Sequence, residues 1–265
     1  IVSDSVWVNR PNYDLYESSP VTAEPGISYL ENGSVYLSLF APGKDFVYLI
    51  GDFNNWICDS MYQMKKDSIS QDSIIFWIQL DGLSSSEEWI FQYYVDGTIR
   101  IADPYTEKVS DPWHDINIPQ SVYPGLKAYP EDKTSEPASY IFPQGMDLQT
   151  PITVGYQPPK QEELVIYELL IRDFSEESSF QGVIDRISYL KDLGVNAIEL
   201  MPVNEFEGNS SWGYNPSFYF AADKYYGPAG KLKELVQMCH ANGIAVIIDA
   251  VLNHAYGQCP LVRLY

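Results

Sequence analysis

Two patterns of hydrophobic and polar positions divide the chain. Between Gly26 and about Asn117, apolar residues occur in short runs or partial alternation, which is typical of β-strands. From Glu163 onward, apolar runs of strand length alternate with apolar residues at helical spacing. Such an alternation is typical of parallel α/β structure. The sequence therefore predicts a β region followed by an α/β region.

The β region contains short strand candidates separated by clusters of Gly, Asp and Ser. Four of them are residues 34–40, 46–50, 74–80 and 89–95. Asp96-Gly97 closes the last one, and this dipeptide favours a tight hairpin turn. Short strands at this spacing predict an immunoglobulin-like β-sandwich over residues 25–118. Residues 1–24 have no sustained period and are predicted as a leader or an incomplete strand region.

A proline-rich stretch follows the β region. Its prolines are Pro119, Pro124, Pro130, Pro137, Pro143, Pro151, Pro158 and Pro159. Proline fixes φ and has no amide hydrogen, so this density excludes long helices and central strands. We predict an extended linker over residues 119–162.

The α/β region reads as strand, helix, strand, helix, strand. The predicted strands are residues 164–171, residues 197–201 and the run from Ile244. The first and the third are predicted to be buried. Gly194 and Gly243 follow the two predicted helices. The resulting (βα)2β unit is shorter than a (β/α)8 barrel, which takes about 250 residues. We therefore expect residues 163–265 to be the first part of such a barrel, and the chain to be a piece of a longer protein.

Composition narrows the choice of partners. The formal net charge of -20 repels phosphate backbones, so we expect no nucleic acid. No run is long and apolar enough to predict a membrane span. The three cysteines lack zinc-site spacing, and we expect Cys239 to be a buried apolar residue.

The first residues of the chain favour an extracytoplasmic location of the protein over a cytoplasmic one. The open strand edges of the incomplete parallel sheet would also allow a homodimer that pairs them.

Polar residues stand where the third predicted strand of the α/β region ends. The apolar run leads directly into Asp249, Asn253 and His254. In an α/β barrel the carboxyl ends of the strands form the active-site face. These three residues are therefore candidates for chemistry rather than packing.

Several motifs of the α/β region, in this order, resemble the α-amylase superfamily, glycoside hydrolase family 13. They are Val165-Ile166-Tyr167-Glu168-Leu169 with Arg172-Asp173-Phe174, Asn196 to Val203, Trp212-Gly213-Tyr214-Asn215-Pro216, and Asp249-Ala250-Val251-Leu252-Asn253-His254. The resemblance implies that His254 bonds the primary hydroxyl of the sugar that is cut, and that Tyr214 stacks on the same ring. It implies that Asp249 orients other charged groups below the site, and that Asn253 aligns with a calcium ligand of many amylases. Each residue also has a purely structural explanation, and Asp173 and Glu199 are expected to be structural.

The β region resembles the carbohydrate-binding family 48 module that precedes the barrel in branching enzymes, isoamylases and pullulanases. Phe40-Ala41-Pro42-Gly43, Val47 to Trp56, Tyr93 to Gly97 and Asp103-Pro104-Tyr105 carry this resemblance. It implies that Trp56 stacks on sugar, although Thr98-Ile99 stand where glucan-binding relatives have a second Trp. The alternative is a spacer domain in which Trp56 packs at a turn.

The resemblance implies an α-glucan as substrate and a retaining glycoside hydrolase as the intact parent. Such hydrolysis needs two carboxylates about 5 to 5.5 Å apart. In the family, the nucleophile Asp and the acid Glu lie on the fourth and fifth barrel strands. We expect both beyond residue 265, so the chain alone is expected to be inactive. Two alternatives stay open, a 1,4-α-glucan branching enzyme and a non-catalytic glucan-binding protein. A metal hydrolase built on Asp249, His254 and Cys259 lacks suitable ligand spacing.

Overall fold

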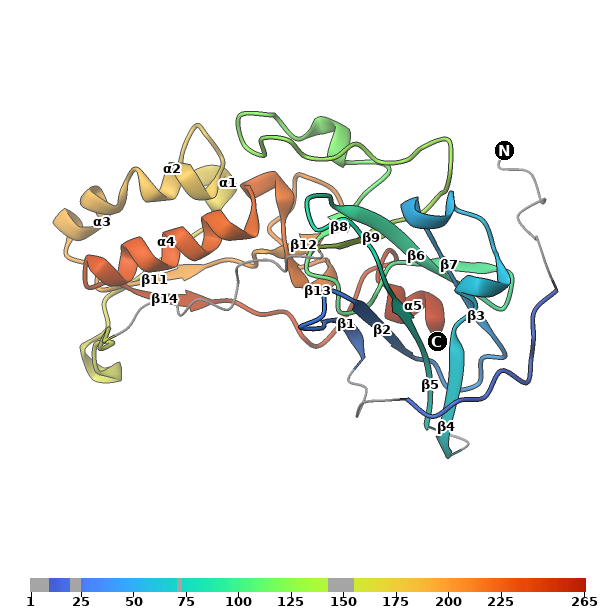
Figure 1. Cartoon of the computed structure of the whole chain (residues 1–265). Helices are drawn as coiled ribbons and strands as arrows, with labels where there is room; N and C mark the ends of the chain where they lie inside the picture. The colour runs from blue at the N-terminus through green and yellow to red at the C-terminus, as the bar shows by residue number, and fades with distance from the viewer. Residues whose placement is uncertain (1–9, 20–24, 71–72, 143–154) are drawn as a thin grey trace. The chain divides into compact units, whose positions relative to one another are not determined.

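The computed structural model describes residues 10–19, 25–70, 73–142 and 155–265, apart from the side chain of residue 69 (Figure 1). These residues form two compact units. The β unit comprises the described residues up to Pro112 together with 128–142 and 257–265. The α/β unit comprises 113–127 and the described residues from 155 to Tyr256. The predicted order of a β region followed by an α/β region is therefore present.

The β unit consists of two antiparallel sheets. The first has the strand order β1-β2-β5-β4 and the second β3-β6-β9-β8, with β7 also paired to β6. Their bounds are β1 Gly26–Tyr29, β2 Val35–Phe40, β3 Val47–Gly51, β4 Lys65–Ser70, β5 Ser73–Leu80, β6 Trp89–Val95, β7 Ile99–Ile101, β8 Val109–Ser110 and β9 Ala138–Ile141. The four strands predicted from the sequence correspond to β2, β3, β5 and β6.

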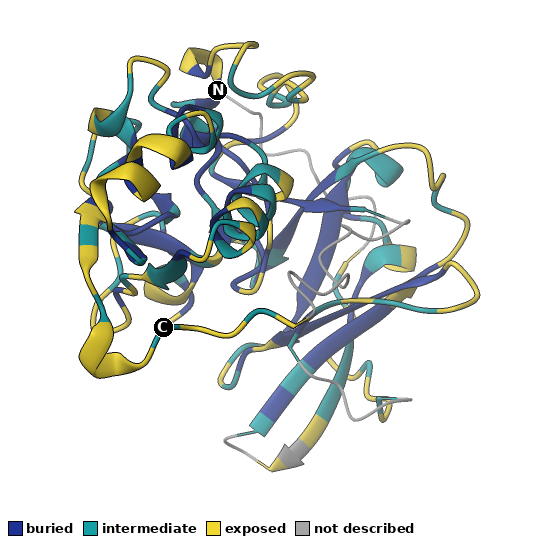
Figure 2. Ribbon diagram, turned by 90° about the vertical axis from the view of Figure 1, so that its left-hand side faces the viewer, coloured by how far each residue is buried: buried dark blue, intermediate teal, exposed yellow. Residues whose placement is uncertain are grey.

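One apolar core is built from both sheets, because alternate residues of a strand point to the same face. Leu37 of β2, Phe76 of β5, Leu49 of β3 and Phe91 of β6 are all buried in it. Figure 2 shows the long strands of this unit largely in dark blue, the colour of buried residues. The opposite face of β3 and β6 packs in a second cluster, which includes Tyr48.

The turn after β6 confirms the hairpin prediction. Asp96 has φ 49° and Gly97 has φ 71°, and the amide of Thr98 donates to the carbonyl of Val95 over 3.1 Å. Positive φ at both central residues of this turn is a geometry that Asp-Gly adopts readily, and the strands resume with Val95 paired to Ile99. β7 then pairs antiparallel with β6.

The proline-rich stretch is not extended throughout, so the exclusion of central strands is wrong here. β9 occupies residues 138–141, directly after Pro137, and lies between β6 and β8 in the sheet. The reason is spacing, because four residues without proline are enough for a short ladder of backbone hydrogen bonds. Gln92 of β6 also holds the preceding segment: its side-chain amide donates to the carbonyls of Ser135, Glu136 and Pro137 over 2.8 to 2.9 Å.

The last residues belong to the β unit, whereas the sequence placed them with the barrel. Helix α5, Pro260–Leu264, follows residue 257. Leu264 is buried in the same core as the two sheets, and Arg263 forms an ion pair with Glu136. A helix of this length is not stable by itself, so its position depends on packing against an existing core, here through Leu264.

The α/β unit is built on three parallel strands in the order β10-β11-β14. They are β10 Ile166–Leu169, β11 Ala197–Leu200 and β14 Ala245–Ile248. Helices α1 Ile171–Phe174, α2 Phe180–Ile184, α3 Ile187–Leu193 and α4 Ala229–Ala241 belong to the same unit. A core joins strand residues such as Leu200 to helix residues such as Leu190 and Leu235, and Figure 1 shows α2, α3 and α4 on one side of the strands.

The prediction that the first and third strands of this unit are buried is wrong. Central β11 is largely buried, but Ile166 of β10 is 47% exposed and Ile248 of β14 is 43% exposed. β10 and β14 each pair only with β11 among the described residues. The helices pack on one face, so apolar residues on the two outer strands keep substantial contact with solvent. The apolar run therefore identified the strands without indicating their burial.

The connection after β11 contains a hairpin and a buried one-turn helix. The hairpin strands are β12 Asn204–Phe206 and β13 Pro216–Ala222, and a 3-10 turn, η5 Lys224–Tyr226, follows. Another turn of this kind, η3 Asp115–Asn117, lies in the 113–127 segment of the same unit. Within the described residues, no helix is long and apolar enough to cross a membrane. Cys58, Cys239 and Cys259 are free and buried, as expected for Cys239.

Candidate functional site

The candidate residues of the third strand lie at the carboxyl end of the parallel sheet. β14 ends at Ile248, which is in register with Leu200 of β11. The amide of Asp249 still donates to the carbonyl of Leu200 over 3.0 Å. The backbone of Asp249 is therefore held by the sheet, and its side chain stands at the rim where the strands stop.

Tyr214 reaches the same rim from the loop between β12 and β13. The loop, residues 207–215, is tied internally, because the side-chain amide of Asn215 donates to the carbonyl of Glu207 over 2.8 Å. Gly213 has φ +88°, and a Cβ atom at this position would lie 2.5 Å from the carbonyl oxygen of Pro202. Only glycine avoids both the strained φ and this contact. Gly213 therefore lets the loop pass close to the end of β11 and present Tyr214.

Three sequence-predicted residues meet here. The Tyr214 hydroxyl donates to Oδ2 of Asp249 over 2.6 Å. Nε2 of His254 lies 2.8 Å from the carbonyl oxygen of Tyr214, and the hydroxyl of Tyr219 donates to the carbonyl of His254 over 2.8 Å. Tyr214 and His254 are exposed, and Asp249 is half-buried. The cluster is therefore ordered by hydrogen bonds while two of its rings stay accessible.

The electrostatics of the cluster keep the phenol of Tyr214 protonated. The hydrogen bond to Asp249 is the main cause that raises the pKa of Tyr214 to about 12, with desolvation and the carboxylates of Asp249, Glu168 and Glu199 adding to it. Glu168 and Glu199 are in register on adjacent strands. A neutral phenol that donates to a carboxylate has a fixed orientation, and Tyr214 remains exposed.

His254 has both ring nitrogens next to groups of the chain. A carbonyl oxygen only accepts hydrogen bonds, so a bond to Tyr214 requires the proton on Nε2. Nδ1 lies 3.1 Å from Oδ1 of Asn253. A sugar hydroxyl that binds to this imidazole therefore has to replace one of these two contacts.

Comparison with known proteins identifies the α/β unit. The family model of the alpha-amylase catalytic domain matches residues 165–261. Residues 165–261 belong to the α-amylase family. The recognition of this family from the sequence motifs is confirmed, and the residues that meet at the rim lie in the matched range.

The chain is similar to two curated members of this group over most of its length. The malto-oligosyltrehalose trehalohydrolase of Saccharolobus solfataricus is 47% identical over 225 residues, which cover 85% of this chain and 34% of that protein. The 1,4-alpha-glucan branching enzyme of Pseudoalteromonas atlantica is 30% identical over 230 residues, which cover 82% of this chain and 28% of that protein. The chain therefore spans about a third of the length of these relatives.

A solved structure shares the fold. The pullulanase SAP of group B Streptococcus, crystallised with maltotetraose, aligns with a TM-score of 0.65 and 22% identity. The alignment covers 91% of this chain and 34% of that one. The fold of this chain is thus found in an α-amylase-type enzyme, and the resemblance at this level of identity concerns the fold alone.

The family resemblance implied a calcium ligand at Asn253, and the structure shows where this side chain lies. The described residues contain no group of three or more His, Cys, Asp or Glu side chains able to hold a metal ion. Oδ1 of Asn253 is directed to the His254 ring instead. Calcium prefers six to eight oxygen ligands, so the amide oxygen of Asn253 would need further oxygen donors to hold this ion.

Trp56 does not lie on a surface where sugar could stack. Its ring is 6% exposed, within the cluster on the outer face of β3 and β6. The indole N–H donates to Oδ1 of Asp52 over 3.1 Å, and Oδ2 of Asp52 accepts from the amide of Ile90 over 3.0 Å. This packing at a turn agrees with the alternative of a spacer domain.

Asp173 is exposed and paired with its neighbour. Nε and a terminal nitrogen of Arg172 donate to its two oxygens over 2.7 and 2.9 Å, and this ion pair holds the pKa of Asp173 below its ordinary value. Arg172 also donates to the carbonyl of Ser211 over 3.3 Å. The pair therefore contacts the loop that carries Tyr214.

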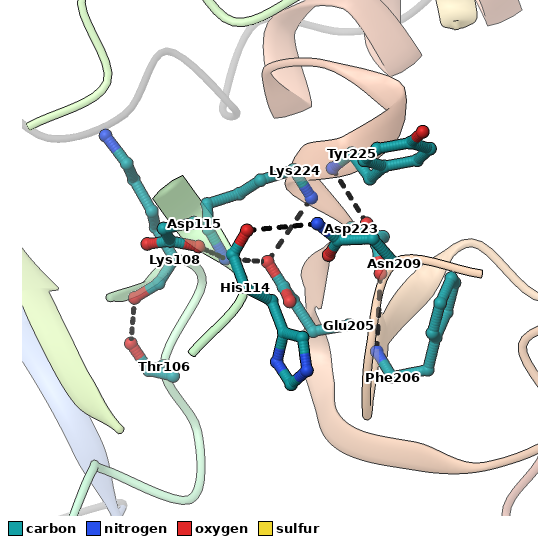
Figure 3. Close-up of polar contacts among 10 residues, drawn as sticks. All are labelled: Thr106, Lys108, His114, Asp115, Glu205, Phe206, Asn209, Asp223, Lys224 and Tyr225. Carbon is teal, nitrogen blue, oxygen red and sulfur yellow. Dashed lines mark hydrogen bonds and ion pairs between the residues drawn. The ribbon is translucent and has the colours of Figure 1, made fainter. Parts of the chain in front are cut away.

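A buried ionic cluster in the same unit was not predicted from the sequence (Figure 3). Lys224, Glu205, Asp115 and Asp223 are between 2% and 8% exposed. Charged residues are rarely buried unless they are paired, and nothing local distinguishes these four from surface residues. The only sequence hint is Glu205 itself, a carboxylate within a short stretch that otherwise has strand character.

Proposed function

We propose that this chain is the amino-terminal part of an α-glucan-active glycoside hydrolase. In this proposal the ring of Tyr214 stacks on the apolar face of a glucose unit, and His254 bonds its primary hydroxyl. Asp249 fixes Tyr214 through the phenol. The observation that carries the proposal is the convergence of these three motif residues, separated in sequence, at the carboxyl ends of β11 and β14.

The physical properties of the cluster suit a neutral sugar. Tyr214 presents an accessible aromatic face, which complements the C–H side of a pyranose. Imidazole and carboxylate groups provide directional hydrogen bonds to hydroxyls. The chain carries a formal net charge of -20, which imposes no electrostatic cost on an uncharged substrate.

The relatives favour hydrolysis of an oligomeric glucan. The relative with 47% identity is named for hydrolysis of malto-oligosyltrehalose, so this compound is the first substrate to test. Starch, glycogen and pullulan follow from the wider family resemblance. Hydrolysis with retention takes a nucleophilic carboxylate and an acid about 5 to 5.5 Å apart. We propose that these belong to later barrel strands, so the 265-residue chain alone binds glucan without cleaving it.

A branching glucanotransferase is the second candidate. The similarity to a 1,4-alpha-glucan branching enzyme over 82% of this chain favours it. Hydrolase and transferase use the same covalent intermediate and differ in whether water or a sugar hydroxyl accepts the glycosyl group. The third candidate, a glucan-binding protein acting through Trp56, loses its support because that ring is buried.

The deciding experiment is an assay of the whole protein to which this chain belongs. It is incubated with malto-oligosyltrehalose, soluble starch and pullulan, and both released trehalose and new reducing ends are quantified. A hydrolase releases trehalose or increases reducing ends. A branching enzyme creates branch points while the number of reducing ends stays constant. If neither product appears, and maltotetraose does not bind, the proposal is wrong.

The 265-residue chain is the matched control in the same assay. We expect it to bind maltotetraose and to produce no reducing ends. Cleavage by this chain alone would contradict the assignment of the nucleophile and the acid to other strands. Replacing His254 by Ala in the whole protein is expected to lower kcat/KM by about a hundredfold, because one directional hydrogen bond to the reacting sugar is lost.

A further inference from the structure

The buried ionic cluster connects three elements of the α/β unit. Glu205 belongs to β12, Lys224 begins η5 directly after β13, and Asp115 begins η3 in the 113–127 segment. Figure 3 shows the ammonium of Lys224 directed at the carboxylate of Glu205, with Asp115 close by. The three side chains come from distant parts of the sequence and meet where solvent is nearly excluded.

Lys224 makes the connections within this cluster. Its Nζ pairs with Oε1 of Glu205 and lies 3.2 Å from Oδ1 of Asp115. Its backbone amide also donates to Oε1 of Glu205 over 3.3 Å. One residue therefore bonds to β12 twice and to η3 once.

Asp223 completes the cluster from the adjacent position. One oxygen accepts from the amide of Tyr225 over 2.8 Å, and the other accepts from the amide of Phe206 over 3.4 Å. The cluster thus holds three carboxyl groups and one ammonium. Burial raises the pKa of Glu205 to about 7 and that of Asp223 well above its ordinary value. Burial alone would lower the pKa of Lys224, but the carboxylates of Glu205 and Asp115 raise it overall.

The hairpin beside this cluster has an irregular strand pairing. β12 and β13 pair at three positions, Asn204 with Ala222, Glu205 with Phe218 and Phe206 with Pro216. The register shifts twice between these pairs. Such bulges bend a strand and redirect side chains. Backbone bonds hold the two ends of the hairpin, from the amide of Asp223 to the carbonyl of Val203 and from the amide of Glu207 to the carbonyl of Asn215. Between these ends the regular ladder is interrupted, so side-chain contacts add to what fixes the hairpin.

The loop of the hairpin is the one that carries Tyr214. A second contact ties it to the same segment as Asp115, because the side-chain amide of Asn209 donates to the carbonyl of His114 over 3.0 Å. Lys224 holds the base of the hairpin, and Asn209 holds the loop. Both contacts lead to residues 114–115, and the positions of Tyr214 and of this segment are consequently linked.

Stability alone is a poor explanation for such a cluster. A buried ion pair loses most of its Coulomb attraction to desolvation, and a well-packed apolar group is often as stable or more stable. What a buried pair adds is a specific geometry, since it is satisfied in one arrangement only. A bulged hairpin next to a binding loop is a place where one arrangement matters.

We propose that Lys224 is a positioning residue: by joining Glu205 of β12 to Asp115 of η3, it fixes the β12–β13 hairpin and, through it, the loop 207–215 that presents Tyr214. The inference rests on the proposed function for its effect on glucan binding, but not for its effect on the loop. Lys224 touches no substrate in this scheme and acts through the placement of Tyr214.

The test replaces Lys224 by Met, which keeps the length of the side chain and removes the ammonium. Lys231→Met is the matched control, because Lys231 lies on α4 of the same unit and pairs with Glu234 at 39% side-chain exposure. Amide hydrogen exchange of residues 207–215 and of α4 is measured in the 265-residue chain. We expect Lys224→Met to speed exchange in the loop about tenfold, with α4 unchanged. Lys231→Met is expected to leave the loop unchanged.

Asp115→Asn is the second variant, and it covers the case in which Lys224→Met does not fold. It keeps the Lys224–Glu205 pair and weakens the link to η3, so loop exchange should rise about threefold. Unchanged loop exchange in the folded variants overturns the inference. Exchange that rises equally in α4 also overturns it, because it means general destabilisation.

Maltotetraose binding separates this inference from the proposed function. Lys224→Met should weaken binding about tenfold in the otherwise unchanged chain and less than twofold in a Tyr214→Ala background, because the effect passes through Tyr214. Equal losses in both backgrounds overturn the positioning role. If the unchanged chain does not bind maltotetraose, the proposed function fails, and the exchange measurement still decides whether Lys224 fixes the loop.

Discussion

Each unit contains a tyrosine that donates to an aspartate, and the two pairs have opposite surroundings. In the β unit, the Tyr93 hydroxyl donates to Oδ2 of Asp103 over 2.7 Å, and both residues are fully buried. In the α/β unit, the Tyr214 hydroxyl donates to Oδ2 of Asp249 over 2.6 Å, and Tyr214 is 40% exposed. The bond is the same, but only one ring has a face open to solvent.

Burial decides what each pair does. Asp103 also accepts from the amide of Tyr105 over 2.7 Å, so its carboxyl group joins two parts of the interior of the β unit. Loss of either donor would leave a buried oxygen without a hydrogen bond and lower the stability of the fold. Tyr214 is fixed by its carboxylate without being covered, which leaves a rigid ring for a ligand. A polar contact to an aromatic residue therefore indicates a site only where the ring remains accessible.

The strongest test of this comparison is Trp56→Ala. Trp56 repeats the buried case, since it is 6% exposed and donates to Asp52. Removing a buried Trp side chain from a packed cluster costs about 3 to 5 kcal/mol. We expect a loss of this size in the free energy of unfolding of the β unit, measured by urea denaturation followed by circular dichroism. Maltotetraose binding to the folded variant should be unchanged, and a large loss of binding would restore Trp56 as a sugar contact.

The second test uses pH. Burial raises the pKa of Asp103 from 3.8 to about 6, so the folded chain binds this proton more tightly than the unfolded chain does. The contribution of Asp103 to stability is therefore greatest below about pH 4, falls as pH rises to about 6, and is then constant. The expected fall is about 3 kcal/mol.

The measurement is the free energy of unfolding between pH 4 and 7 for the wild type and for Asp103→Asn. The variant keeps the shape of the side chain and removes its charge, so other carboxylates cancel in the difference between the two proteins. The wild type should lose stability relative to the variant as pH rises. A difference that is constant over this range would mean that Asp103 titrates normally.

The third test makes the same substitution in both pairs. Tyr93→Phe leaves a buried carboxylate oxygen without its donor and should cost about 1 to 3 kcal/mol of stability. Tyr214→Phe affects an exposed group and should change stability by less than about 0.5 kcal/mol. In contrast, we expect Tyr214→Phe to weaken maltotetraose binding about threefold, because the ring is no longer held in place.

Calorimetry of maltotetraose binding and urea denaturation provide the two readouts. Tyr93→Phe is the control for binding, and it should bind as the wild type does. If Tyr214→Phe binds maltotetraose as tightly as the wild type, the bond to Asp249 does not position the ring. If it destabilises the chain as much as Tyr93→Phe does, the distinction between the two pairs is wrong.

Much of the local structure could be predicted. The strands of the β unit were visible as short apolar runs, and Asp96-Gly97 predicted its turn because few other residues adopt positive φ at low cost. The motifs at Tyr214, Asp249 and His254 predicted residues that the structure brings together. The predictions failed where burial or strand position was inferred from residue type alone, as for the outer strands β10 and β14 and for β9 between prolines.

The sequence by itself determined the order and approximate position of the main strands and helices, because these depend on backbone geometry and on the spacing of neighbouring side chains. Only the tertiary structure decided which of these residues are covered and which meet. Tyr214 and Asp249 are 35 residues apart in sequence, and Lys224 meets Asp115 from another segment. Such contacts depend on how the whole chain closes on itself, and no local pattern encodes the burial that separates a structural tyrosine from an accessible one.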